Sequence, residues 1–181
     1  RATLEAIVAA PEEFPRQVDP RLGLYRTFQA IWGSTHLDDR VEDSDPAAWA
    51  HCIMVNLVGG YHVLRAALPH LARGGVIANL SSGAAAAEHA GWSAYAASKA
   101  GLERLSATLA AERPDLVALA VRPGVTATGM QDAIKASRVD NAIRQMPKEE
   151  MQPVAVPAAA IARLFTGTLP AFAERIVEAR V

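Results

Sequence analysis

Two short apolar runs separated by a helical segment constrain the fold most tightly. Residues 76–80 and 116–121 are almost continuously apolar, as in strands that are buried on both faces of a sheet. Residues 93–111, which lie between them, have a helical pattern that ends before Pro114. Strands that alternate with long helices require parallel crossover connections. The sequence therefore predicts an α/β fold with a mainly parallel sheet.

The remaining elements follow from local signals. A helix over residues 46–71 would be capped by Ser44 or Asp45, with Pro46 at its first position and a close-packing Gly59-Gly60 inside it. The polar segment 126–152 is expected to be mobile. Further helices are expected at residues 2–10 and 157–164, and further strands at 24–32 and 175–181.

Length, charge and cysteine content exclude several classes of function. The 181 residues suffice for one domain, and a net charge of −1 gives no basic surplus for nucleic acid. Cys52 is the single cysteine, so neither an internal disulfide nor a cysteine-rich metal site is expected. The five histidines show no ligand spacing with acids, so no metal is expected. The apolar runs are interrupted well before twenty residues, which predicts no membrane span and a cytoplasmic protein.

The most informative chemical pair is Tyr95 and Lys99. Residues four positions apart share one face of a helix, so the ammonium of Lys99 lies next to the phenol of Tyr95. A neighbouring cation favours the phenolate, and the pKa of Tyr95 is therefore expected to fall towards neutrality. Ser81 and Ser82 end a predicted parallel strand, at the edge where open α/β sheets bind their ligands.

The order and spacing of several motifs resemble those of the short-chain dehydrogenase/reductase family. The serine of that family precedes the tyrosine by thirteen positions, which selects Ser82 over Ser81. The resemblance covers about residues 45–181 and implies a Rossmann-like parallel sheet with helices on both faces. Residues 91–95 and 128–131 look most like the fungal branch that is similar to sepiapterin and benzil reductases. The motifs that carry the resemblance are Asn56, Asn79-Leu80-Ser81-Ser82, Tyr95 with Lys99, Arg122-Pro123-Gly124 and Thr128.

The resemblance implies a role for each matched residue. Tyr95 would be the general acid/base, and Lys99 would lower its pKa while holding the nicotinamide ribose. Ser82 would bind the substrate carbonyl, and Asn56 would anchor a water in a proton relay. The nicotinamide side would be lined by Pro123, Gly124 and Thr128, and the substrate pocket by Ala84, Trp92 and Met130, with residues 129–152 as wall and lid.

The first part of the chain departs from the family pattern. The family opens with a Gly-x-x-x-Gly-x-Gly turn at the cofactor pyrophosphate, whereas only Gly23 and Gly33 precede Asn56 here. Trp32 stands where the family has its Asn-Ala-Gly segment. We therefore interpret residues 1–181 as one domain, in which 1–44 are a divergent remnant, shortened or degenerate, and 45–181 form the catalytic part.

Three functions remain open at this stage. The chain is an NADP(H)-dependent reductase if a cofactor-binding segment lies upstream of Arg1. It is otherwise a shortened, cofactor-independent isomerase, dehydratase or cyclase that uses the same Tyr95, Lys99 and Ser82. A non-catalytic partner subunit is the third possibility, and the intact catalytic set argues against it.

The sequence also indicates the kind of substrate and partner. Few charges are expected close to Tyr95, which favours a small or medium apolar or aromatic carbonyl, or the matching alcohol. Relatives pair the helices that correspond to residues 46–71 and 93–111 between subunits, so the resemblance implies a homodimer or homotetramer.

The missing glycine-rich turn yields a first testable expectation. Backbone N–H groups at a helix N-terminus bind pyrophosphate only where glycines let the chain come close. We expect the 181 residues to bind NADPH with a Kd of about 1 mM or weaker, and a chain with a native glycine-rich extension to bind at about micromolar Kd. Isothermal titration calorimetry on both forms decides, and micromolar binding by the 181 residues contradicts the expectation.

Overall fold

A parallel sheet lies at the centre of the chain. The computed structural model describes residues 39–166 and 176–178. Within them the strands pair in parallel in the order β1-β2-β3, with Val76 opposite Val117 and Arg122 opposite Glu178. The α/β fold with a parallel sheet is thus confirmed. The strands are β1 (Val76–Leu80), β2 (Val117–Arg122) and β3 (Ile176–Glu178).

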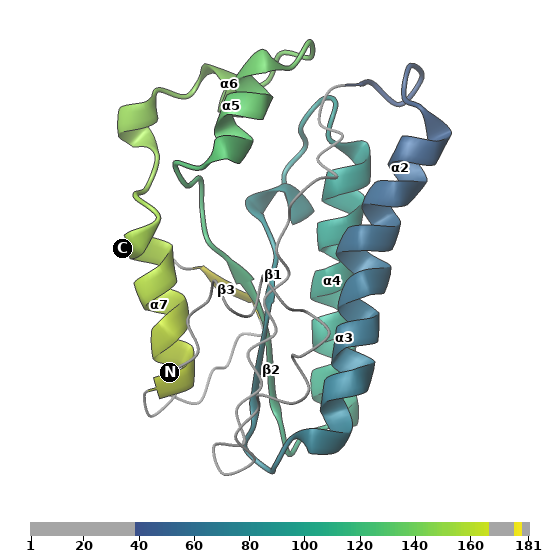
Figure 1. Cartoon of the computed structure of the whole chain (residues 1–181), viewed down its shortest axis with the longest axis vertical. Helices are drawn as coiled ribbons and strands as arrows, with labels where there is room; N and C mark the ends of the chain where they lie inside the picture. The colour runs from purple at the N-terminus through teal and green to yellow at the C-terminus, as the bar shows by residue number, and fades with distance from the viewer. Residues whose placement is uncertain (1–38, 167–175, 179–181) are drawn as a thin grey trace.

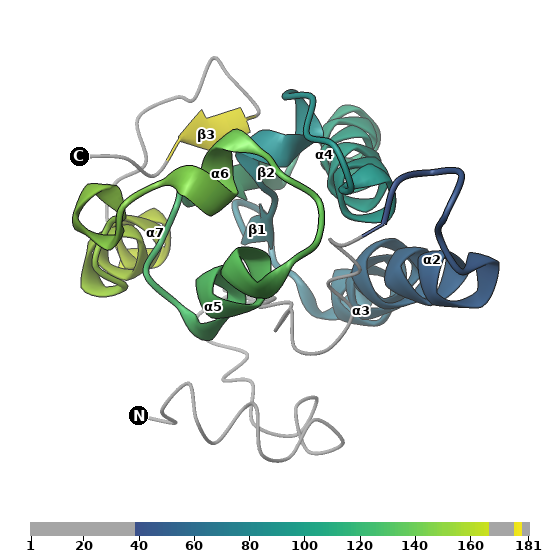
Figure 2. The ribbon, with the colours of Figure 1, turned by 90° about the horizontal axis from the view of Figure 1, so that it is seen from above.

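Helices cover both faces of this sheet (Figure 1). One face carries α4 (Ser93–Glu112) and α3 (Gly59–Ala67), and the other carries α7 (Ala155–Thr166). The view from above in Figure 2 shows the same three layers, with α7 and α4 on opposite sides of β1 and β2. The Rossmann-like arrangement expected from the sequence is therefore present.

The alternation of side chains along the strands explains why both faces are apolar. Ile77 and Ala118 are buried against α3 and α4, whereas Val76 and Leu119 are buried against α7. Each strand therefore needs apolar residues at successive positions, because neither face meets water.

The first long helix is continuous but not uniform. It comprises α2 (Pro46–Ile53), a π-helical segment (Met54–Val58), α3 and a 3₁₀ turn (Leu68–His70). The side chain of Asp45 caps it by accepting a hydrogen bond from the amide of Ala47 at 3.1 Å. The π segment, which the sequence did not predict, widens the helix around the buried Asn56.

The same helix bears on the expectation of no membrane span. Pro46–His70 passes that test by length and composition, with a mean hydropathy of 1.2 in its best window. Cys52 and Asn56 of this helix are buried against the domain, and α2 packs along α4. Only 22% of that window is buried, and length and hydropathy alone are weak evidence for a membrane span.

Residues 126–152, which were expected to be mobile, contain regular secondary structure. The segment contains α5 (Gly129–Ala136), α6 (Ala142–Gln145) and a 3₁₀ turn (Lys148–Glu150). Ile134 is 1% exposed and packs in a cluster with Trp92 and Tyr95. Few apolar residues suffice here because α5 buries only one side, so the average polarity of the segment hides its order.

Other boundaries shift by small amounts. The helix expected at 157–164 extends over Ala155–Thr166, and the strand expected at 116–121 is Val117–Arg122. Ile176–Glu178 confirms part of the final strand. The helix expected at 2–10, the strand expected at 24–32 and Trp32 lie outside the described residues.

Candidate active site

The carboxyl ends of β1 and β2 open onto a cavity of about 730 Å³. Its wall comes from the segments after both strands, the start of α4, and α5 and α6, which lie beyond the strand ends in Figure 1. Asn56 and Lys99 are buried behind this wall and do not line it. The expected site residues that do line it are Ser82, Ala84, Trp92, Tyr95, Pro123, Gly124, Thr128 and Met130.

Tyr95 and Ser82 are brought together from α4 and the end of β1. Tyr95 is only 3% exposed, and its phenol is hydrogen-bonded to the side chain of Ser82. The Ser82 oxygen also accepts a hydrogen bond from the amide of Ala84 at 3.2 Å, which caps the short 3₁₀ turn Gly83–Ala85. This cap fixes the direction of the serine hydroxyl.

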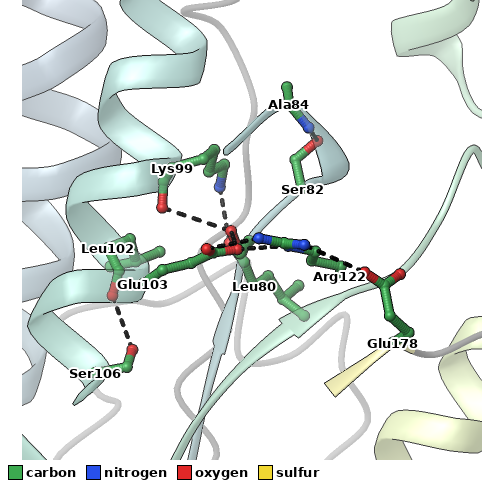
Figure 3. A network of polar contacts seen from close by, with 10 residues as sticks. Leu80, Ser82, Ala84, Lys99, Leu102, Glu103, Ser106, Arg122 and Glu178 are labelled. Atoms are coloured by element: carbon green, nitrogen blue, oxygen red, sulfur yellow. Dashed lines mark hydrogen bonds and ion pairs between the residues drawn. The ribbon is translucent and has the colours of Figure 1, made fainter. Parts of the chain in front are cut away.

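Lys99 lies one helical turn after Tyr95 and is fully buried. Its Nζ donates a hydrogen bond to the carbonyl oxygen of Leu80 at 2.9 Å and lies 5.7 Å from the centroid of the Tyr95 ring. Figure 3 shows this bond spanning from α4 to the end of β1. The lysine therefore lies beneath the site, where it contacts the strand end and the tyrosine ring.

Burial sets the acid–base properties of this pair. Burial lowers the pKa of Lys99 to about 8, with the nearby Cys52 acting in the opposite direction. The pKa of Tyr95 is raised above its ordinary value of 10, because burial outweighs the hydrogen bond from Ser82 that lowers it.

The expectation that the pKa of Tyr95 falls towards neutrality is therefore wrong, because burial of the phenol outweighs the effects that lower its pKa. Below pH 8, however, Lys99 is a buried cation next to a protonated tyrosine.

Asn56 connects the first long helix to α4. Its Nδ2 donates to the Ser98 hydroxyl at 3.1 Å and to the Cys52 sulfur at 3.4 Å. The Ser98 hydroxyl in turn donates to the backbone carbonyl of Tyr95 at 2.7 Å. The Asn56 side chain is thus linked, through the Ser98 hydroxyl, to the backbone carbonyl of Tyr95.

The wall of the cavity next to Tyr95 is aromatic and apolar. Trp92 packs edge-on against Tyr95 with ring centroids 5.9 Å apart, and His89 packs on Trp92 at 4.7 Å. Met130 and Ile134 of α5 join the same cluster. Gly124 has a φ of +76°, a conformation that favours glycine, and it brings bare backbone to the cavity.

Three polar residues near the site were given no role from the sequence, although Arg122 belongs to the Arg122-Pro123-Gly124 motif. Glu103 and Arg122 form an ion pair beside the ends of β1 and β2, and Cys52 lies beside Asn56. Glu103 follows Tyr95 by eight positions and Lys99 by four, so helical spacing places all three on one face. That spacing was the sequence signal by which Glu103 could have been identified. Within residues 39–166 and 176–178, no group of three or more His, Cys, Asp or Glu residues could hold a metal ion.

Comparison with known proteins identifies the same family as the sequence motifs. A family model described as short chain dehydrogenase matches residues 33–139. An uncharacterized oxidoreductase of Schizosaccharomyces pombe is 37% identical over 80 residues, which are 44% of this chain and 32% of the relative. The match thus spans about a third of the length of this curated relative.

Solved structures share the fold. A short chain dehydrogenase/reductase from Saccharomyces cerevisiae superposes with a TM-score of 0.78 at 23% identity, covering 98% of this chain and 71% of the other. A short chain dehydrogenase from Shigella flexneri 2a, solved in complex with NADP, has a TM-score of 0.68 at 21% identity. It covers 99% of this chain and 71% of that one. At these identities the structures establish the fold.

The low pKa of Lys99 predicts how stability depends on pH. Between pH 8 and about 10.4 the unfolded chain still binds the lysine proton that the folded protein has released. Raising the pH through this window therefore favours the folded state. We expect the free energy of unfolding of the wild type, relative to Lys99→Met, to rise by about 1 kcal/mol per pH unit between pH 8 and 9.5.

Urea unfolding at pH 7, 8, 9 and 9.5 measures this difference. Lys148→Met is the control, because the Lys148 side chain is 64% exposed, and it should leave the pH dependence unchanged. Tyr95 does not interfere, because its raised pKa lies above the window. A flat difference between the wild type and Lys99→Met would show that Lys99 does not titrate near pH 8.

Proposed function

Because the chain belongs to the short chain dehydrogenase family, we propose that it is an oxidoreductase that interconverts a carbonyl and an alcohol with NADP(H). The observation that carries the proposal is the cluster at the strand ends. The Tyr95 phenol is hydrogen-bonded to Ser82 on the cavity wall, and the Lys99 amine lies behind it. The NADP complex of the Shigella flexneri relative supports the choice of cofactor.

The described residues fit the nicotinamide end of such a cofactor. Pro123, Gly124 and Thr128 line the cavity beside Tyr95, and the positive φ of Gly124 leaves room for a close approach. Lys99 reaches the Leu80 carbonyl and not the cavity, so a contact with the ribose requires its Nζ to leave that oxygen. When bound, a nicotinamide dinucleotide supplies or accepts the hydride.

The chain's own residues handle the proton. In the reducing direction the Ser82 hydroxyl donates a hydrogen bond to the substrate oxygen, and Tyr95 transfers its phenolic proton to that oxygen. Lys99, a cation below pH 8, stabilises the negative charge that develops on Tyr95. Asn56 holds the helical turn of Tyr95 in place through Ser98. In this proposal Asn56 also binds the water that supplies the next proton to Tyr95.

The cavity wall favours an apolar or aromatic substrate. Ala84, Trp92, Met130 and Ile134 surround the approach to Tyr95, so a substrate there meets mainly apolar side chains. We propose a small or medium apolar or aromatic ketone, aldehyde or matching alcohol as the substrate class.

The same cluster of Tyr95, Ser82 and Lys99 would also suit a second candidate function that transfers a proton but no hydride. A cofactor-independent isomerase, dehydratase or cyclase would use Tyr95 as the proton carrier with the same Lys99 and Ser82. Turnover that depends on Tyr95 but not on NADP(H) would favour this candidate.

Replacement of Tyr95 tests the proposed chemistry. Tyr95→Phe keeps the ring packed against Trp92 but removes the proton donor, so we expect kcat to fall at least about a hundredfold. The measurement is NADPH oxidation with a panel of apolar and aromatic carbonyls. Tyr61→Phe is the matched control, because Tyr61 is 47% exposed on α3 and should retain wild-type turnover. Wild-type rates in Tyr95→Phe would remove Tyr95 from the mechanism.

The outer face of the first long helix supports a homodimer or homotetramer. Met54 and Tyr61 lie two turns apart, 56% and 47% exposed, and give this helix an apolar stripe directed away from the sheet. We expect light scattering to show a dimer or tetramer at micromolar concentration, and Met54→Lys combined with Tyr61→Glu to yield monomers. A monomeric wild type at that concentration would contradict the proposal.

A further inference from the structure

The residues proposed to act in catalysis arrive at the cavity on separate segments. Ser82 follows β1, Tyr95 and Lys99 lie on α4, and Pro123-Gly124 follow β2. The sheet joins β1 to β2 through main-chain hydrogen bonds. The middle of a helix has no free main-chain groups, so side chains must hold α4 in place against the two strand ends. Proton and hydride transfer are sensitive to displacements of about 1 Å.

Glu103 makes this connection. It lies on α4, one turn beyond Lys99, and its carboxylate accepts hydrogen bonds from Nε and Nη2 of Arg122 at 2.7 and 2.8 Å. The same carboxylate accepts a hydrogen bond from the Ser81 hydroxyl at 2.7 Å. Arg122 ends β2 directly before Pro123, and Ser81 directly precedes Ser82. Figure 3 shows Glu103 and Arg122 meeting between α4 and the strand ends.

The geometry of this contact makes it directional. Two parallel hydrogen bonds between a guanidinium and a carboxylate fix both the distance and the relative orientation of the two groups. The side chains are 16% and 11% exposed, so water competes little for their bonds. The second contact of Arg122, to Glu178 on β3, is a single 3.4 Å bond to a carboxylate that is 42% exposed. Glu103 is therefore the partner that orients Arg122.

We propose that Glu103 is a positioning residue, which through Ser81 and Arg122 holds the ends of β1 and β2 against α4 and so fixes Ser82 and Gly124 relative to Tyr95. Glu103 does not line the cavity, so it acts through these neighbours. Its charge is balanced by Arg122, so its effect on the reaction is geometric. The catalytic consequence rests on the proposed function, whereas the mechanical consequence does not.

Amide hydrogen exchange in Glu103→Gln tests the mechanical part. At the end of β1 the Ser81 amide donates to the Val121 carbonyl at 2.7 Å, and in the segment that follows β2 the Ala127 amide donates to the Gln152 carbonyl at 2.9 Å. We expect both amides to exchange at least about tenfold faster in the variant, measured by NMR on the protein without cofactor or substrate. At the opposite end of the sheet, the Gly74 and Val117 amides should keep their wild-type rates.

The chain contains a matched control for this experiment. Arg113 and Asp115 form the same two-bond contact, at 2.8 and 2.9 Å. Their pair precedes β2 and so lies roughly 20 Å from Arg122, given the rise per residue of a strand. Asp115→Asn should leave the Ser81 and Ala127 amides and the turnover unchanged.

Turnover tests the catalytic part. In Glu103→Gln we expect kcat to fall at least about tenfold, with KM changed less than about threefold and an unaltered pH profile. Arg122→Lys keeps the positive charge but loses the paired bonds, and it should reproduce both effects. If Glu103→Gln does not fold, Arg122→Lys is measured in its place.

The outcomes separate this proposal from the proposed function. Wild-type exchange at Ser81 and Ala127 overturns the positioning role, even if Tyr95 proves catalytic. Equal acceleration at all the measured amides also overturns it, because Glu103 would then contribute only global stability. Loosened strand ends with undiminished kcat overturn the catalytic consequence. If the wild type reduces no carbonyl, the proposed function fails, and the exchange rates still decide whether Glu103 holds the strand ends.

Discussion

The parallel pairing of β1 and β2 is the constraint on which the rest of the structure depends. In register from Val76 with Val117 to Leu80 with Val121, it brings the ends of both strands to the same edge of the sheet. Ser82 and Gly124 then lie on one cavity, although they are far apart in the sequence. Parallel strands need a crossover, and α4 is the helix of that crossover. Tyr95 and Lys99 lie on the first turns of α4, so the crossover itself brings them to the same edge of the sheet.

The sequence predicted best the elements with the strongest apolar or helical patterns. Residues 76–80 and 93–111 were placed correctly because continuous apolar runs and helical periodicity leave few alternatives. The helices within residues 126–152 were not predicted, because α5 buries little more than Ile134 and Gln131 while the rest of the segment is polar. The π segment at Asn56 also escaped prediction. It coincides with a tertiary contact, the hydrogen bond from Asn56 to Ser98 on α4, which the local sequence does not report.

Within the candidate site, the sequence predicted which residues meet but not the electrostatic result. The spacing of Tyr95 and Lys99 fixes their adjacency, whereas their pKa values depend on burial, which spacing does not report. Glu103 was missed for a related reason. A glutamate at helical spacing is typical of a solvated face, and only the fold shows that Arg122 arrives opposite it from the end of β2.

Burial, with no carboxylate acting on it, sets the pKa of Lys99. An unpaired carboxylate one helical turn from Lys99 would favour the ammonium, raise its pKa and compete with Tyr95 for its charge. Both oxygens of Glu103 are instead engaged by the guanidinium of Arg122. No carboxylate lies among the groups that shift the pKa of Lys99, which burial lowers to about 8. The lysine is thus charged at neutral pH, without an acidic partner, and 5.7 Å from the tyrosine ring on which negative charge would develop.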